Sequence, residues 1–96
     1  MYLGNIYNKP ATDKIKLEKV YNEDRFHVML LQLKEGELLK PHHASTDAFL
    51  LVAEGEIIFI LKEKEFHLKK GDMLTFKSME THSVQALKDA TVLITK

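Results

Sequence analysis

From Lys14 onward, short runs rich in β-branched, aromatic and aliphatic residues alternate with short polar breaks. None of these runs shows the i, i+3, i+4, i+7 apolar repeat that marks an amphipathic helix. Gly36, Gly55 and Gly71 stand at breaks, where a tight turn often needs a residue that accepts a positive φ. The pattern therefore predicts an all-β domain of short strands. The predicted strands are Ile15 to Tyr21, Phe26 to Lys34, Ala48 to Ala53, Glu56 to Lys62, Glu65 to Leu68, Met73 to Phe76, Ser83 to Leu87 and Thr91 to Thr95.

The length of 96 residues predicts a single domain over residues 1–96, with residues 1–14 as an N-terminal arm or an edge strand. The predicted strands Phe26 to Lys34 and Glu56 to Lys62 are apolar at successive positions, so both of their faces are apolar. One face fills the interior, and the other needs a cover. We therefore expect a homodimer, formed by sheet-to-sheet packing or by exchange of the N-terminal segment.

The charges exclude several classes of partner. The chain has 14 Lys and Arg residues and 14 Asp and Glu residues, interspersed, so no basic surplus predicts binding to nucleic acid or to an anionic membrane. No apolar run approaches the roughly 18 residues of a membrane span. The chain has no cysteine and its first residues lack the pattern of a signal peptide, so we expect a cytoplasmic protein without disulfides or thiolate zinc sites.

Two segments resemble the motifs of the cupin superfamily. Gly36 to His42 matches the spacing of the first half of the first motif, and Phe49 to Glu56 resembles the strand and turn that close it. Gly71-Asp72 and His82 match parts of the second motif. The resemblance implies a small single-domain cupin, with the double-stranded β-helix or jelly-roll barrel of that superfamily and a pocket inside the barrel.

Four positions depart from the motifs. Ala44 stands at the position of the second motif histidine, and Ala48 stands where the family has a glutamate. Lys77 replaces the proline of the second motif, and Met79 replaces its glycine. The order His42, four residues, Asp47-Ala48 is similar to a subgroup of small stand-alone bacterial cupins, many of which have no assigned activity. Membership implies a pocket but no particular reaction, because function belongs to sites rather than folds.

The surviving motif histidines, His42 and His82, are the leading candidates for ligands of a divalent metal such as Fe, Mn, Ni or Zn. Regular alternation from His42 points Asp47 away from the pocket. A β-bulge between Ala44 and Ala48 would reverse this and complete a two-histidine, one-carboxylate site. His43, turned inward, is the alternative third ligand. If neither Asp47 nor His43 binds the metal, the metal site is partial or absent.

Each candidate also has a structural interpretation. Instead of binding a metal, His42 and His82 could be interior histidines that form hydrogen bonds and orient a ligand or a water. The sequence favours neither role over the other. For Asp47 we favour a loop cap that accepts backbone N–H groups. The expected lining of the pocket completes the set of candidate residues: Leu50, Val52, Phe59, Met79 and Val84.

Three functions remain open at this point. The first is a cupin that binds a small molecule, and optionally a divalent metal, in the barrel. The second is a metal-dependent oxygenase or isomerase that acts on a small oxygenated substrate. The third is a metal-free structural, accessory or sensing barrel. The sequence leaves open whether the protein is an enzyme.

Overall fold

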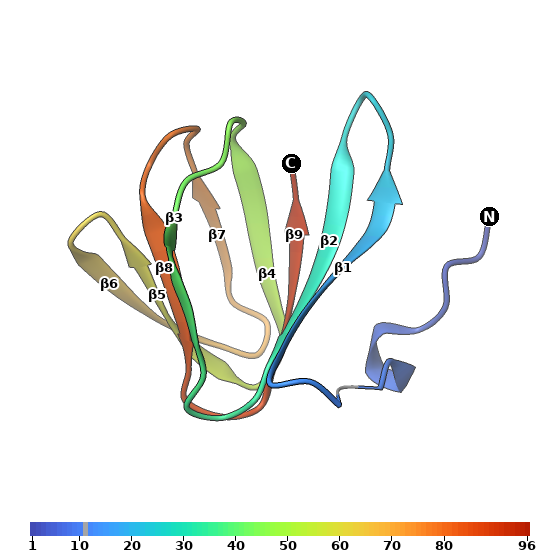
Figure 1. Cartoon of the computed structure of the whole chain (residues 1–96), viewed down its shortest axis with the longest axis horizontal. Helices are drawn as coiled ribbons and strands as arrows, with labels where there is room; N and C mark the ends of the chain where they lie inside the picture. The colour runs from blue at the N-terminus through green and yellow to red at the C-terminus, as the bar shows by residue number, and fades with distance from the viewer. Residues whose placement is uncertain (11) are drawn as a thin grey trace.

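The computed structural model describes residues 1–10 and 12–96, and within these residues the chain forms nine β-strands and one short 3-10 turn (Figure 1). The 3-10 turn η1 covers Ile6–Asn8. The strands are β1 (Ile15–Asn22), β2 (His27–Leu33), β3 (Leu38–His42), β4 (Ala48–Glu54), β5 (Glu56–Leu61), β6 (Lys64–Lys69), β7 (Met73–Phe76), β8 (His82–Ala86) and β9 (Ala90–Thr95). No helix in the described part is long and apolar enough to cross a membrane.

The strands form two antiparallel sheets that face each other (Figure 1). The five-stranded sheet has the order β1-β2-β9-β4-β7, and the four-stranded sheet has the order β3-β8-β5-β6. The chain passes back and forth between the sheets, so neighbours in space are seldom neighbours in sequence. The predicted all-β jelly-roll barrel is confirmed.

The predicted strands coincide with observed ones to within a few residues, but the prediction lacked β3. This strand lies at the edge of the four-stranded sheet, and most of its side chains are exposed. Its sequence, LLKPH, contains a proline and only two apolar residues at its start. An exposed edge strand carries no alternating apolar signal, because only one of its edges and part of one face touch the protein.

The core fills the space between the inner faces of the two sheets. Its largest fully buried side chain is Phe59, on β5, which has an exposed fraction of 0%. The aliphatic side chains around it come from both sheets, as strand alternation requires. Its buried members are Leu31, Leu33, Ala48, Leu50, Val52, Ile57, Phe59, Leu68, Phe76, Val84, Ala86, Ala90 and Val92.

The N-terminal arm packs against the outer face of its own five-stranded sheet. The hydroxyl of Tyr7 donates to the carbonyl of Ala53 over 3.1 Å, and the Gln32 side chain donates to the carbonyl of Lys9 over 3.3 Å. An ion pair joins Lys9 to Glu18, with 3.1 Å between Nζ and Oε2. The arm thus covers part of the second apolar face on which the dimer prediction rests. No strand lies in residues 1–10 or 12–14 of this arm.

Candidate functional site

His42 and His82 lie side by side at one end of the barrel. β3 and β8 are paired so that His42 stands opposite His82. The centroids of the two imidazole rings are 4.2 Å apart, and the rings meet edge to face. Two histidines that are forty positions apart in the sequence are therefore neighbours in the folded chain.

A β-bulge in β3 points His42 toward His82 and the cavity beside it, although His42 itself stays exposed. Leu39 pairs with Val84, whereas His42 pairs with His82, so the register shifts by one residue between Leu39 and His42. Regular alternation from the inward-facing Leu39 would point His42 outward, because the side-chain period is two. The extra residue at Lys40-Pro41 restores the inward direction. The chain has this bulge within β3, not in the segment from Ala44 to Ala48 where the carboxylate hypothesis required one.

A backbone carbonyl fixes the tautomer of each histidine. His42 donates from Nδ1 to the carbonyl of Lys40 over 2.9 Å, and His82 donates from Nδ1 to the carbonyl of Glu80 over 3.0 Å. A carbonyl oxygen can only accept, so both Nδ1 atoms carry the hydrogen. In the neutral rings the lone pair then lies on Nε2. Both imidazoles thus keep Nε2 for a ligand, a water or a metal ion.

The two histidines line a cavity of about 150 Å³. Phe76 packs against His82 with 4.4 Å between ring centroids, and Phe59 lies on the same ring at 5.7 Å. The rest of the wall is mainly aliphatic and comes from β1, β2, β3 and β9. The lining residues are Leu17, Met29, Leu31, Leu39, His42, His43, Ala44, Phe76, His82, Ile94 and Lys96.

The surroundings of His82 favour its neutral form. Burial lowers the pKa of His82, because a charged imidazolium loses solvation in the interior. The hydrogen bond to the Glu80 carbonyl opposes this by raising the pKa. The positive charges of His42, Lys96 and His43 lower it further. The net shift of the pKa is downward, so the fold favours the neutral ring, whose Nε2 carries a lone pair.

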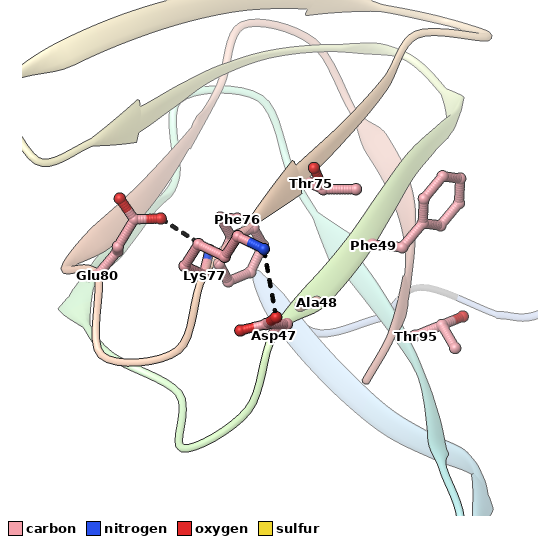
Figure 2. A pocket seen from close by; sticks show the side chains of 8 residues that line it. All are labelled: Asp47, Ala48, Phe49, Thr75, Phe76, Lys77, Glu80 and Thr95. Atoms are coloured by element: carbon pink, nitrogen blue, oxygen red, sulfur yellow. Dashed lines mark hydrogen bonds and ion pairs between the residues drawn. The ribbon is translucent and has the colours of Figure 1, made fainter.

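Asp47 lies outside the cavity of the histidines. It lines a separate pocket of about 410 Å³ on the β4–β7 side (Figure 2). Its carboxylate accepts the backbone N–H of Ser78 over 2.9 Å and pairs with the Lys77 amine at 3.6 Å. The Ser78 N–H is the main reason that the pKa of Asp47 is lowered. This geometry agrees with the loop-cap interpretation, with the capped loop being the one between β7 and β8.

Most of the residues expected to line the pocket lie in the hydrophobic core instead. Leu50, Val52, Phe59 and Val84 are buried in the core at exposed fractions of 2% or less, and they are absent from the wall of the cavity. In the folded chain the motif segments form part of the wall, and β1, β2 and the end of the chain from β9 onward supply the rest.

Met79 is 63% exposed and has a φ of +66°. It stands where the cupin motif has a glycine, and the left-handed backbone explains why glycine suits that position. Its N–H donates to the Ala44 carbonyl over 2.8 Å, which joins the loop after β7 to the loop after β3. Met79 therefore shapes the end of the barrel through its backbone, and its side chain points away from the cavity.

Sequence reasoning missed several lining residues, among them Leu17, Met29, Leu39, Ile94 and Lys96. The alternation in β2 could have indicated Met29 once Leu31 was placed in the core, because the two share a face. Leu17 could have been found from the same alternation in β1. No local signal marks Lys96, which reaches the cavity only because β9 runs between β2 and β4.

Comparison with known proteins agrees with this architecture. The cupin domain family matches residues 28–95, which covers most of the chain. The chain belongs to the cupin family. No curated protein matches this cupin in sequence.

Three solved structures show how widely its fold is shared. An RmlC-like cupin protein from Desulfovibrio desulfuricans is 24% identical, covers 99% of this chain and 94% of its own, and has a TM-score of 0.89. KdgF from Halomonas sp. is 18% identical, with coverage of 99% and 90% and a TM-score of 0.84. Salicylate 1,2-dioxygenase from Pseudoaminobacter salicylatoxidans is 20% identical with a TM-score of 0.71, matching 73% of this cupin but 19% of the larger enzyme. At these identities the likeness establishes the fold alone.

The donor set does not fit a complete catalytic metal site. Across residues 1–10 and 12–96, no group of three or more His, Cys, Asp or Glu side chains is arranged to hold a metal ion. Catalytic zinc and non-haem iron sites usually have three protein ligands. His42 and His82 supply two. His43 lines the same cavity, and Asp47 lines the other pocket.

Proposed function

We propose that this cupin binds a small molecule in the cavity beside His42 and His82. The observation that supports the proposal is the pair of imidazoles that face one cavity, each with Nδ1 held by a carbonyl and Nε2 left for a ligand. Side chains fixed in this way bind without losing much conformational freedom, which favours affinity. The aliphatic wall and Phe76 provide apolar contact, as in most small-molecule sites.

The same two Nε2 atoms support a second candidate function, in which the cavity holds a divalent metal ion. Two neutral imidazoles, each oriented by a backbone carbonyl, are suitable ligands for Fe, Mn, Ni or Zn. Such an ion would act as a Lewis acid toward an oxygen-containing ligand, the chemistry an oxygenase or isomerase would need. One structural relative is named a dioxygenase. With two protein ligands, we expect the ion to be held weakly.

Elemental analysis of untagged protein, purified without chelator, separates the two candidates. The comparison uses the wild type, His42→Gln, His82→Gln and the control His67→Gln, because His67 lies outside the cavity and pairs with Glu56. Stoichiometric metal in the wild type and the control, lost in both cavity variants, would favour the metal-dependent function. If no sample contains metal, even after reconstitution, the result would favour a site that binds a small molecule without a metal.

Ligand binding itself is tested by the melting temperature in the presence of small molecules, because a compound that binds only the folded state raises stability. We expect a rise in the wild type that is lost in the His42→Gln, His82→Gln double variant. If no compound shifts the wild type, and the double variant behaves like the wild type in every assay, the barrel has a structural or accessory role and the proposal is wrong.

A further inference from the structure

A second cavity adjoins the one that holds the histidines. It measures about 270 Å³ and shares Met29 and Lys96 with the first. Its other walls come from the β1–β2 hairpin and the loop after β3, which lie at the same end of the barrel as the C-terminus (Figure 1). The lining residues are Lys19, Asn22, His27, Met29, Ser45, Thr46 and Lys96. The two cavities therefore lie side by side, and we call them together the recess, with the cavity of the histidines as its inner part and the second cavity as its outer part.

The charged side chains that line this recess are basic. Lys19 and Lys96 line the outer part, and Lys96 also reaches the inner part. No Asp or Glu side chain lines either part among the residues that the structure describes, although the chain as a whole has 14 acidic and 14 basic residues. No ion pair of Lys19 or Lys96 occurs in the described residues. Basic side chains around a recess attract ligands that carry a negative charge.

Neutral hydrogen-bonding groups accompany these charges. Ser45 and Thr46, whose side chains carry hydroxyl groups, line the outer part. The ring of His27 is hydrogen-bonded through Nδ1 to the side-chain oxygen of Asn22, which holds both side chains in place. The main-chain oxygen of Lys96 is already engaged by the N–H of His27. Hydroxyl and ammonium donors together are the usual partners of an anionic oxygen.

The inner part has a different character. Apart from the histidines and Lys96, its wall is apolar, with Leu17, Leu39 and Ile94 among its residues. A volume of about 150 Å³ corresponds to roughly five waters, at about 30 Å³ each. That space suits a short carbon skeleton. The recess as a whole thus matches a molecule with a small carbon body and an anionic end.

Resting on the proposed small-molecule function, we infer that the ligand is a small organic carboxylate. Its carboxylate lies in the outer part, near Lys96, Lys19 and the hydroxyls of Ser45 and Thr46. Its carbon body reaches the inner part, where oxygen substituents meet the Nε2 atoms of His42 and His82.

Two matched sets of compounds test this inference. Their binding to the protein is measured by thermal shift and calorimetry at pH 7.5 and low salt. One set contains 2-oxo acids, 2-hydroxy acids and uronic acids of about three to six carbons, sized to the recess. The other contains the corresponding primary amides. We expect at least one carboxylate to raise the melting temperature while its amide does not. Its affinity should fall with added salt, because salt screens the lysine charges.

Lys96→Met tests the placement of the charge. We expect a loss of affinity of about fivefold or more, as for the loss of one charge contact. The control is Lys70→Met, because Lys70 pairs with Glu54 away from the recess. The control should bind like the wild type, and both variants should keep the wild-type melting temperature without ligand.

The possible outcomes distinguish failure of the carboxylate inference from failure of the proposed small-molecule function. Equal binding of amides and carboxylates would overturn the carboxylate inference and leave the small-molecule function intact. Binding of inorganic phosphate with no carboxylate bound would also overturn it, because the site would then recognise an anion without a carbon body. If neither set shifts the wild type, the carboxylate inference fails, and the proposed function is then decided by the wider set of small molecules and the His42→Gln, His82→Gln double variant described above.

Discussion

His82 is the histidine most affected by the fold, since it is buried against Phe59 and Phe76 with an exposed fraction of 5%. Its pKa lies below the usual 6.5, with burial as the largest cause. Below pH 6.5 the unfolded chain therefore binds a proton here that the folded chain does not. The stability that His82 contributes at neutral pH is lost as the pH falls through this window.

We predict that the free energy of unfolding declines more steeply for the wild type than for His82→Gln between pH 7 and pH 5, by at most about 1.4 kcal/mol per pH unit. Urea denaturation at each pH measures the slope. The carboxyl groups with lowered pKa, Asp47 and Glu56, have usual values of 3.8 and 4.5 and contribute mainly at more acidic pH. Equal slopes for the two proteins would show that burial does not shift the titration of His82.

Gly55, between β4 and β5, gives a second prediction at this scale. Its φ is +84°, and a Cβ added there would lie 2.1 Å from the Asp89 carbonyl oxygen. Gly36 has a similar φ of +86° but no atom within 4 Å of its added Cβ. We expect Gly36→Ala to cost about 1 kcal/mol for the backbone strain alone. Gly55→Ala should cost about 3 kcal/mol or more, because the β8–β9 turn must also move.

Urea denaturation of both variants measures the difference between strain alone and strain with a clash. A similar loss in the two proteins would mean that the turn after β8 adapts without cost. That result would contradict the close packing of the β4–β5 and β8–β9 turns described above.

At the scale of elements, two loops and one bulge build the end of the barrel that carries the histidines. The bulge in β3 sets the direction of His42. The Met79 N–H links the loop after β7 to the carbonyl of Ala44 in the loop after β3. The loop between β7 and β8 also contains Glu80, whose carbonyl orients His82. The positions of the two histidines thus depend on irregular backbone outside the strand ladders.

The strained residue in this set of loops is Met79, and Met79→Gly should stabilise the protein. A left-handed φ of +66° suits glycine, and the side chain is 63% exposed, so little packing is lost. We expect a gain of about 0.5–1 kcal/mol in urea denaturation. The control Ser78→Gly, at a neighbour without positive φ, should lose stability. A loss in Met79→Gly would show that its side chain supports the fold.

At the scale of the whole molecule, the dimer remains a prediction. The outer face of the five-stranded sheet carries Phe49 and Leu51 on β4, Met73 on β7 and Leu93 on β9, by strand alternation in the observed register. Phe49 is 39% exposed and Met73 is 64% exposed. The arm contacts this sheet at Ala53 and Gln32. The partly exposed apolar residues beyond these contacts are a surface that a second copy could cover.

Sedimentation velocity tests the dimer. We expect a dimer for the wild type at micromolar concentration and a monomer for the double variant Phe49→Glu, Met73→Glu, because each charge would be buried without a partner. The control Leu38→Glu, at a residue 46% exposed on β3 of the other sheet, should remain dimeric. A monomeric wild type would show that the N-terminal arm alone covers the sheet sufficiently.

The sequence by itself determined the fold class, most of the strands and the two motif histidines. These follow from local patterns: alternation and β-branched runs specify strands, and glycines specify turns. The resemblance of the segments around Gly36, Gly71 and His82 to the cupin motifs implied the barrel. β3 was missed because an exposed edge strand with a proline carries no such pattern.

Only the tertiary structure decided what surrounds the histidines. The bulge at Lys40-Pro41 reverses the direction of His42, and that depends on the pairing of β3 with β8. Asp47 is excluded from the cavity because its carboxylate accepts the Ser78 N–H across another loop. Lys96 reaches the recess because β9 lies between β2 and β4. Side-chain direction has a period of two along a strand, so one extra residue or one change of neighbour alters the site without altering the local sequence pattern.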